Sequence, residues 1–215
     1  MKLFTLLVIC LLTVGICACS TGVQGSGNEK NDLRKVDPFD SIAISGAYEL
    51  SAESGKPEQK LEINTDDNLL PLIKTEVSNG LLKIYSTESI SPSKTVKISI
   101  TALNLKDVSF SGAGKISLSG IKNPAFKMTI SGAGSVNCTG ETDAFDLNIS
   151  GAGSIDAKDL KVKKSYVSMS GAGSAKVYAS EELNAEISGV GSVDYFGNPA
   201  KVNQKISGMG KLTKN

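Results

Sequence analysis

A four-residue phrase that recurs six times constrains this chain more than any other feature. Each copy reads Ser-Gly-x-Gly, where x is Ala in the first four copies, Val in the fifth and Met in the sixth. The copies begin at residues 111, 131, 150, 170, 188 and 207, so successive starts lie 20, 19, 20, 18 and 19 residues apart. A period near 20 residues is typical of a solenoid, in which each repeat is one structural unit stacked on the previous one.

The repeats also alternate between apolar and polar residues. In the third repeat one parity holds only apolar residues and glycines, namely Leu147, Ile149, Gly151, Gly153, Ile155 and Ala157. The second, fourth and fifth repeats follow the same pattern. Alternation with a period of two predicts strands that turn one face toward a core. Each repeat is therefore expected to form two short strands that flank two inward glycines.

The glycines of the phrases are interpreted as structural corners of the repeats. Because glycine has no Cβ, it permits a positive φ and lets the backbones of successive repeats approach closely. The residues assigned to this role are Gly112, Gly114, Gly132, Gly134, Gly151, Gly153, Gly171, Gly173, Gly189, Gly191, Gly208 and Gly210.

Two all-β architectures fit this pattern. Consecutive strands could pair antiparallel as hairpins, or each repeat could be one coil of a β-helix whose strands pair in parallel with those of the next coil. Parallel coiling stacks identical positions on one another and so explains why the phrase recurs in register. We therefore favour a β-helix-like solenoid of about six 18–20-residue coils, starting at about residue 105, with a spacing of about 4.8 Å per coil.

The residues before the repeats predict an all-β section continuous with the solenoid. Asn79-Gly80 is the strongest hairpin signal, between alternating segments at 74–77 and 81–85. The stretch Asp66–Ile73 does not alternate and predicts one helical turn. Residues 36–215 are thus expected to form a single domain. Within it, polar segments such as 139–143 are expected to be turns between repeats.

The first 18 residues resemble the signal peptide of a bacterial lipoprotein. Lys2 precedes an apolar stretch, Leu3–Ile16, which is shorter than the roughly 20 residues that a membrane-spanning helix needs. In the sequence Ile16-Cys17-Ala18-Cys19, Cys19 occupies the position that is lipidated, for example with palmitate. Ser20 favours the outer membrane in such proteins. Ordinary secretion with cleavage nearby is the alternative.

Residues 19–35 are rich in glycine and polar side chains and have no apolar period. Such a composition does not bury enough apolar surface to become ordered. This segment is therefore expected to be a flexible tether between the lipid, which would attach the protein to the membrane, and the domain.

Composition excludes several functions. The 23 basic and 22 acidic side chains balance and form no basic cluster, which argues against a nucleic-acid partner. The chain has no His, so it lacks the commonest general base and metal ligand. Cys138 has inward parity and is interpreted as a small buried hydrophobic residue. No cofactor, metal ligand or catalytic residue is assigned.

A few residues are candidates for chemistry or binding. Acidic residues gather at Glu141, Asp143 and Asp146 and again at Glu181, Glu182 and Glu186, where solvated turns are the simpler interpretation. Asp156 and Asp194 occupy one repeat position that would suit Ca²⁺, but the fourth repeat places Lys176 there, which is incompatible with a ladder of cations. The three tyrosines of the repeat region, which would suit a glycan groove, are Tyr166, Tyr178 and Tyr195.

Several motifs together resemble a known family. These are the Ser-Gly-Ala-Gly repeats, Asp37-Pro38-Phe39-Asp40-Ser41-Ile42, Ile44-Ser45-Gly46-Ala47-Tyr48 and Asp66-Asp67-Asn68-Leu69-Leu70. Residues 36–214 resemble the head GIN domain family of auto-transporter adhesins (DUF2807), found largely in lipoproteins and exported proteins of Bacteroidetes. The resemblance implies a right-handed β-helix-like fold and an extracytoplasmic location, and it supplies no catalytic residues.

These observations predict a non-enzymatic lipoprotein of the cell envelope. It would sit at the outer membrane, on the periplasmic or cell-surface side, and act as an adhesin or binding module. Its partner would be an envelope glycan, a protein or a second copy of itself. A structural or assembly module of the envelope is the alternative, followed by a glycan-active enzyme.

Overall fold

The computed structural model describes residues 22–215, and the chain is all-β, as predicted. The expected signal peptide and the lipidation site at Cys19 lie outside the described residues. A two-stranded sheet joins β1 (Val23–Gln24) to β7 (Ile90–Ser91), and the other fourteen strands form one mixed, open sheet. The expected helical turn is a 3-10 helix, η1 (Leu70–Leu72). Within residues 22–215 no helix is long and apolar enough to cross a bilayer.

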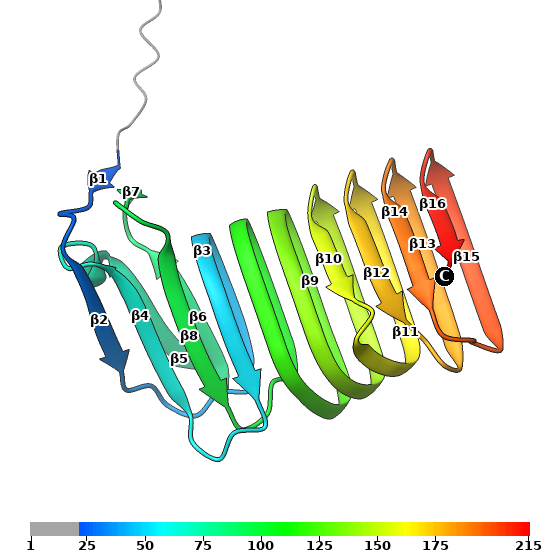
Figure 1. Ribbon diagram of the computed structural model, residues 1–215, viewed down its shortest axis with the longest axis horizontal. Helices are drawn as coiled ribbons and strands as arrows, with labels where there is room; N and C mark the ends of the chain where they lie inside the picture. The colour runs from blue at the N-terminus through cyan, green and yellow to red at the C-terminus, as the bar shows by residue number, and fades with distance from the viewer. Residues whose placement is uncertain (1–21) are drawn as a thin grey trace, which may run out of the picture.

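Successive repeats pair in parallel, with identical positions side by side. The strands are β9 (Asp107–Gly151), β10 (Ser154–Ala157), β11 (Leu160–Gly171), β12 (Ser174–Tyr178), β13 (Glu182–Gly189), β14 (Ser192–Phe196), β15 (Lys201–Gly208) and β16 (Lys211–Lys214). One series runs β9–β11–β13–β15 and the other β9–β10–β12–β14–β16 (Figure 1). Parallel stacking, rather than a series of hairpins, therefore joins the repeats.

The parallel register extends to a strand that precedes the first phrase. β3 (Ser41–Ser54) pairs with Asp107–Ser119, which places Gly46 beside Gly112 and Tyr48 beside Gly114. Tyr48 thus stands where later repeats have their second glycine, and its ring is buried. The stack of equivalent strands begins at β3.

The first glycine of each phrase meets the backbone of the neighbouring repeat. Gly151 and Gly171 have φ values of 140° and 141°, a region that L-residues rarely adopt. A Cβ on Gly171 would press into the carbonyl oxygen of Gly151, and a Cβ on Gly151 into that of Gly132. A side chain at either position would be strained and would also separate two repeats.

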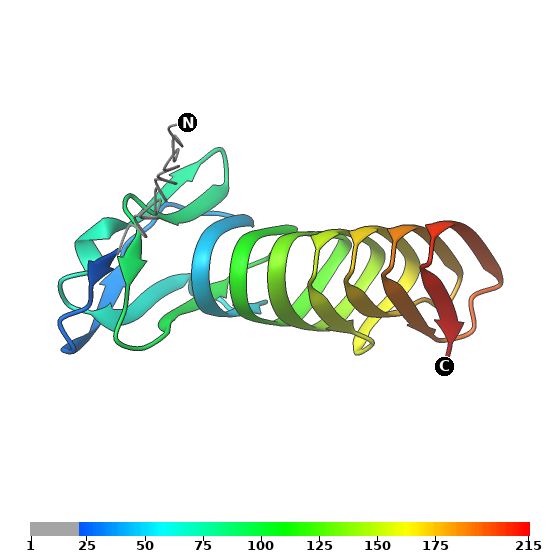
Figure 2. The ribbon, with the colours of Figure 1, turned by 90° about the horizontal axis from the view of Figure 1, so that it is seen from above.

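Antiparallel strands close the other end of the stack. β4 (Lys60–Asp66) lies antiparallel between β2 (Glu29–Arg34) and β8 (Val96–Ala102). The predicted hairpin is confirmed in β5 (Ile73–Ser78) and β6 (Leu81–Ser86), where Asn79 and Gly80 both have positive φ. Viewed from above, this section and the strands β15 and β16 lie at opposite ends of the molecule (Figure 2).

The expectation of a flexible tether is wrong for residues 29–34, which form the edge strand β2. Backbone pairing with β4 holds this strand, so it needs no apolar period. The Arg34 guanidinium also donates hydrogen bonds to the carbonyl oxygens of Leu70 and Ile73. Asp66, 1% exposed, accepts hydrogen bonds from the Gly27 N–H and from Ser93.

The predicted turn at residues 139–143 is also wrong, because these residues lie inside β9. Gly140–Thr142 pair in parallel with Leu160–Val162. Thr142 is buried, and its hydroxyl donates to Ala144 O and contacts Asn123 Oδ1. At this inward position the alternating pattern would predict an apolar residue. Thr142 is buried there instead, because its hydroxyl is hydrogen-bonded.

The core is a continuous column of inward side chains. Phe126 and Phe145, from neighbouring repeats, stack with ring centroids 5.8 Å apart. Cys138 is fully buried, and this burial raises the pKa of its thiol to about 12. The column stays closed as far as β13, whereas every residue of β15 is exposed.

Candidate functional site

The outward side chains of successive repeats form columns across the sheet. Parallel register places Asp146, Tyr166, Asn184 and Asn203 in one column and Asn148, Ser168, Glu186 and Lys205 in the next. β9, β11, β13 and β15 each contribute one residue to each column, because a strand turns every second side chain to the same face. Polar side chains from four repeats therefore lie together on one face.

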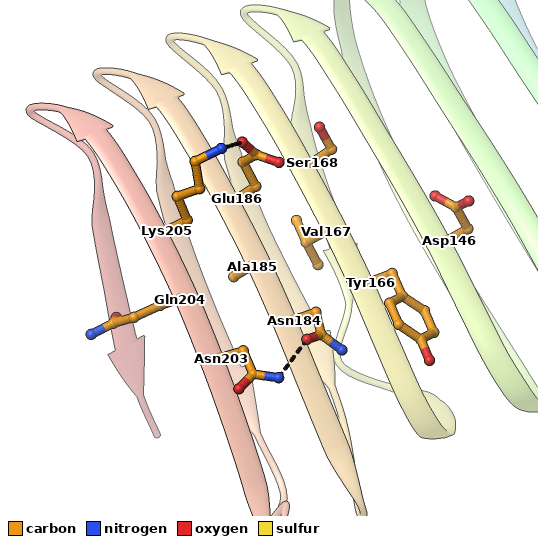
Figure 3. Close-up of a pocket in the computed structure, with 10 residues that line it drawn as sticks. All are labelled: Asp146, Tyr166, Val167, Ser168, Asn184, Ala185, Glu186, Asn203, Gln204 and Lys205. Carbon is orange, nitrogen blue, oxygen red and sulfur yellow. Dashed lines mark hydrogen bonds and ion pairs between the residues drawn. The ribbon is translucent and has the colours of Figure 1, made fainter.

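These two columns line an open groove of about 320 Å³. Seven outward residues border it, and Figure 3 shows them as sticks: Asp146, Tyr166, Ser168, Asn184, Glu186, Asn203 and Lys205. Val167, Ala185 and Gln204 complete the lining. Tyr166 is the one aromatic residue of the lining, and 41% of its surface is exposed.

Hydrogen bonds fix the polar side chains on one side of the groove. Asn203 Nδ2 donates to Asn184 Oδ1 at 2.7 Å (Figure 3). Asn184 Nδ2 donates in turn to Glu182 Oε1 at 3.1 Å. Glu182 also receives Lys201 Nζ at 2.8 Å, and this hydrogen bond contributes most to lowering the pKa of Glu182. The amides are therefore oriented by a chain of contacts that ends on an ionised carboxylate.

Ion pairing and hydrogen bonding also hold the other groove carboxylates. Lys205 Nζ lies 2.5 Å from Glu186 Oε1, and this contact raises the pKa of Lys205. Asp146 Oδ1 accepts a hydrogen bond from Asn148 Nδ2 at 2.8 Å. Farther along the face, burial raises the pKa of Asp107, which the positive charge of Lys127 partly offsets.

Of the three tyrosines proposed from sequence for a glycan groove, the structure places Tyr166 in this one. Tyr178 is half-buried, and Lys161 Nζ lies 4.3 Å from the centre of its ring. Tyr195 packs against the core. Tyr166 is therefore the tyrosine that offers an open ring to a ligand.

The two acidic groups seen in the sequence do not become clusters of carboxylates. Asp143 pairs with Lys163 at 2.7 Å, and Glu182 and Glu186 pair with lysines of the next repeat. The register also sets Lys176 between Asp156 and Asp194. In the part of the chain that the structure describes, no three His, Cys, Asp or Glu side chains gather as a metal site would require.

The groove suits a ligand with many hydroxyl groups. Amides donate and accept hydrogen bonds, carboxylates accept them and Lys205 donates, while a sugar hydroxyl does both. The Tyr166 ring adds an apolar surface with a polar tip. Sequence reasoning missed Asn184, Asn203 and Lys205 as site residues. Aligning outward positions at the repeat spacing would have placed them beside Tyr166.

Several solved structures resemble this fold. A putative adhesin from Bacteroides fragilis matches 90% of this chain and 100% of its own, with a TM-score of 0.73 and 23% identity. A putative adhesin from Parabacteroides merdae matches 90% and 98%, with a TM-score of 0.56 and 21% identity. A putative lipid binding protein from Parabacteroides distasonis matches 90% and 99%, with a TM-score of 0.52 and 23% identity. At these identities the likeness concerns the fold alone.

No curated protein matches the chain. A family model, in contrast, matches residues 38–199, from the segment before β3 to the loop after β14. This range includes the antiparallel section and most of the stacked repeats. The chain belongs to the family described as "Putative auto-transporter adhesin, head GIN domain" (DUF2807).

Proposed function

We propose that this protein is a non-enzymatic binding module of the cell envelope that recognises a glycan through the groove around Tyr166. The observation that carries the proposal is an exposed aromatic ring flanked by oriented amides and carboxylates on one open face. Its membership in an adhesin family supports a role in binding. The stack would wind as a right-handed β-helix of about six coils and hold the groove rigidly.

The contacts of the acidic side chains in the groove support binding without catalysis. Glycosidases commonly need one carboxyl group held protonated as an acid beside a second carboxylate. In the groove Glu186 is held by Lys205, and Asp146 accepts a hydrogen bond from Asn148. Both groups thus already act as hydrogen-bond acceptors, as they would toward the hydroxyl groups of a ligand.

A glycan array tests this proposal. The protein applied to the array should start at residue 22, because the strands β1 and β2 belong to the fold. Tyr166→Ala is expected to weaken binding at least tenfold, about 1.4 kcal/mol, whereas Tyr166→Phe keeps the ring and most of the affinity. Tyr85→Ala, on the β5–β6 hairpin, is the matched control. Equal binding by Tyr166→Ala, or release of shortened glycan products, would contradict the proposal.

We further propose that Cys19 carries the lipid that anchors the protein to the outer membrane. The leader sequence supports this assignment. Labelling of cells with radioactive palmitate is expected to mark the wild type and a Cys17→Ser variant but not Cys19→Ser. Protease added to intact cells then distinguishes the two sides, since a domain degraded only after the outer membrane is opened faces the periplasm.

A further inference from the structure

The last strand of the stack, β15, has an inward face that nothing in the described chain covers. Val202, Gln204 and Ile206 occupy the positions that Leu183, Ala185 and Ile187 hold in β13. The β13 residues are at most 4% exposed, whereas Val202 and Ile206 are 41% and 40% exposed. The core column therefore ends with apolar side chains open to solvent. Solenoids ordinarily protect such an end with a terminal cap that has a polar outer face.

Apolar exposure is concentrated at this end of the molecule. Val190 and Met209 stand at the third position of the last two phrases, where earlier repeats have Ala, and they are 54% and 82% exposed. Together with Val202 and Ile206 they make up four of the eight large hydrophobic residues exposed within the described chain. Clustered exposed apolar side chains beside an unpaired strand edge mark an interaction surface.

The charges at this end indicate what kind of partner would bind there. Residues 196–215 contain four lysines and no Asp or Glu. Along one column the sign of the side-chain charge alternates from repeat to repeat. The residues of this column are Lys164, Glu182 and Lys201. A second column, on the other side of the one that holds Asn184 and Asn203, ends with Glu186 followed by Lys205. A strand added after β15 would continue both columns best with carboxylates.

Lysines on an edge strand can instead serve to prevent pairing. Here, however, Lys201 and Lys205 are drawn back toward β13 by Glu182 and Glu186. No charged side chain or proline stands at the inward positions of β15, where it would block a further strand. The strand is thus left able to pair.

We propose that the free edge of β15 receives a β-strand from a partner protein, with two acidic residues four positions apart opposite Lys201 and Lys205. On the same strand, apolar residues would cover Val202 and Ile206. Addition of a strand to a sheet edge supplies main-chain hydrogen bonds for affinity, while the side chains set specificity. A second copy meeting the same end is disfavoured, because residues 196–215 of each copy would bring four lysines and no Asp or Glu to the contact.

The sequence of β13 provides a probe. Its residues Glu182-Leu183-Asn184-Ala185-Glu186-Ile187 already lie on β11 with Glu182 beside Lys164. If a copy of this segment pairs in parallel with β15, as β13 does with β11, its two glutamates lie beside Lys201 and Lys205. Its Leu and Ile would then lie over the exposed Val202 and Ile206.

The experiment measures binding of a fluorescent peptide spanning residues 180–191 to the full-length chain in detergent. A peptide with Glu182→Lys and Glu186→Lys is expected to bind at least tenfold more weakly. The protein variant Lys201→Gln/Lys205→Gln should bind the original peptide at least tenfold more weakly, as should Ile206→Ser. Circular dichroism verifies that each variant is folded, and all of these positions are exposed. Tyr85→Ala, on the β5–β6 hairpin at the other end of the molecule, should leave peptide binding unchanged.

Hydrogen exchange locates the contact, since a bound strand should protect amides of β15 and leave those of β2 unchanged. Equal binding of the charge-reversed peptide, or protection at β2, would overturn the proposal. So would a dimer that buries β15 in sedimentation experiments. Association of the lysine-rich end with anionic vesicles, without any peptide binding, would also overturn it.

Discussion

At the scale of single residues, the first glycine of each phrase never varies among the six copies, while the third residue changes from Ala to Val and Met. The structure explains the difference. The first glycine faces the carbonyl oxygen of the neighbouring repeat at a positive φ, whereas the third residue points to solvent. The invariant first glycine is thus explained by the meeting of two backbones at its position.

Gly171→Ala is expected to destabilise the protein by about 2 kcal/mol, which combines backbone strain with a clash against Gly151. For a chain of this size the melting temperature should fall by about 4–8 °C. Ala172→Ser, at the adjacent exposed position, should change it by less than about 1 °C. Thermal unfolding followed by circular dichroism measures both. A Gly171→Ala protein as stable as the control would show that the repeats can separate at this point without loss.

Asp66 is expected to make the N-terminal segment sensitive to acid. Hydrogen bonds from Ser93, and then from the Gly27 N–H, lower the pKa of Asp66 in the folded protein. Because the pKa of Asp66 is lower in the folded protein than in the unfolded chain, ionised Asp66 stabilises the fold above the unfolded pKa of about 3.9. This stabilisation is lost as the pH falls through the folded pKa. Limited proteolysis should therefore cleave residues 22–35 faster in strong acid than at pH 7. Asp66→Asn should be cleaved quickly at both, and equal rates for the two proteins at pH 7 would contradict this role.

At the scale of elements, alternation in the sequence indicated most of the strands, because an inward position is apolar wherever a core lies beneath it. It did not indicate β2, whose residues are held by backbone pairing and by Arg34. It also missed the pairing of residues 139–143, since the buried Thr142 appears polar in sequence. Of the groove residues, the sequence indicated Tyr166 as a glycan contact, and Asp146 and Glu186 only as members of two acidic groups. The groove's residues become neighbours through register, which a single strand does not reveal.

An insertion should have opposite effects inside a strand and in a loop. One residue added between Ala185 and Glu186 of β13 turns Glu186 inward and Ile187 outward, because side chains alternate with a period of two. We expect this protein to be insoluble or to melt at least about 10 °C lower. The same residue added between Pro199 and Ala200, in the loop before β15, should shift the melting temperature by less than about 2 °C. Similar melting of the two insertions would contradict the fixed register.

At the scale of the whole molecule, each repeat pairs mainly with its two neighbours, so the chain should tolerate the loss of an entire unit. Deletion of residues 152–171 joins Gly151 to Ala172 and removes one full repeat, because Gly151 and Gly171 are partners in register. The product should fold cooperatively with a lower melting temperature. Deletion of residues 152–161 alone breaks the register and should yield an unfolded chain. Gel filtration and circular dichroism distinguish the two results, and equal folding of both products would contradict a modular stack.

The parallel pairing of the repeats also determines how the molecule carries mechanical load. The hydrogen bonds between repeats point along the long axis, from β3 to β15 (Figure 1). A force applied between the β3 end and a partner held at β15 therefore passes through each interface between repeats in turn. Interfaces in series do not share the force, so the strength of the whole rod equals that of its weakest junction. Lengthening such a rod by further repeats extends its reach without making it stronger.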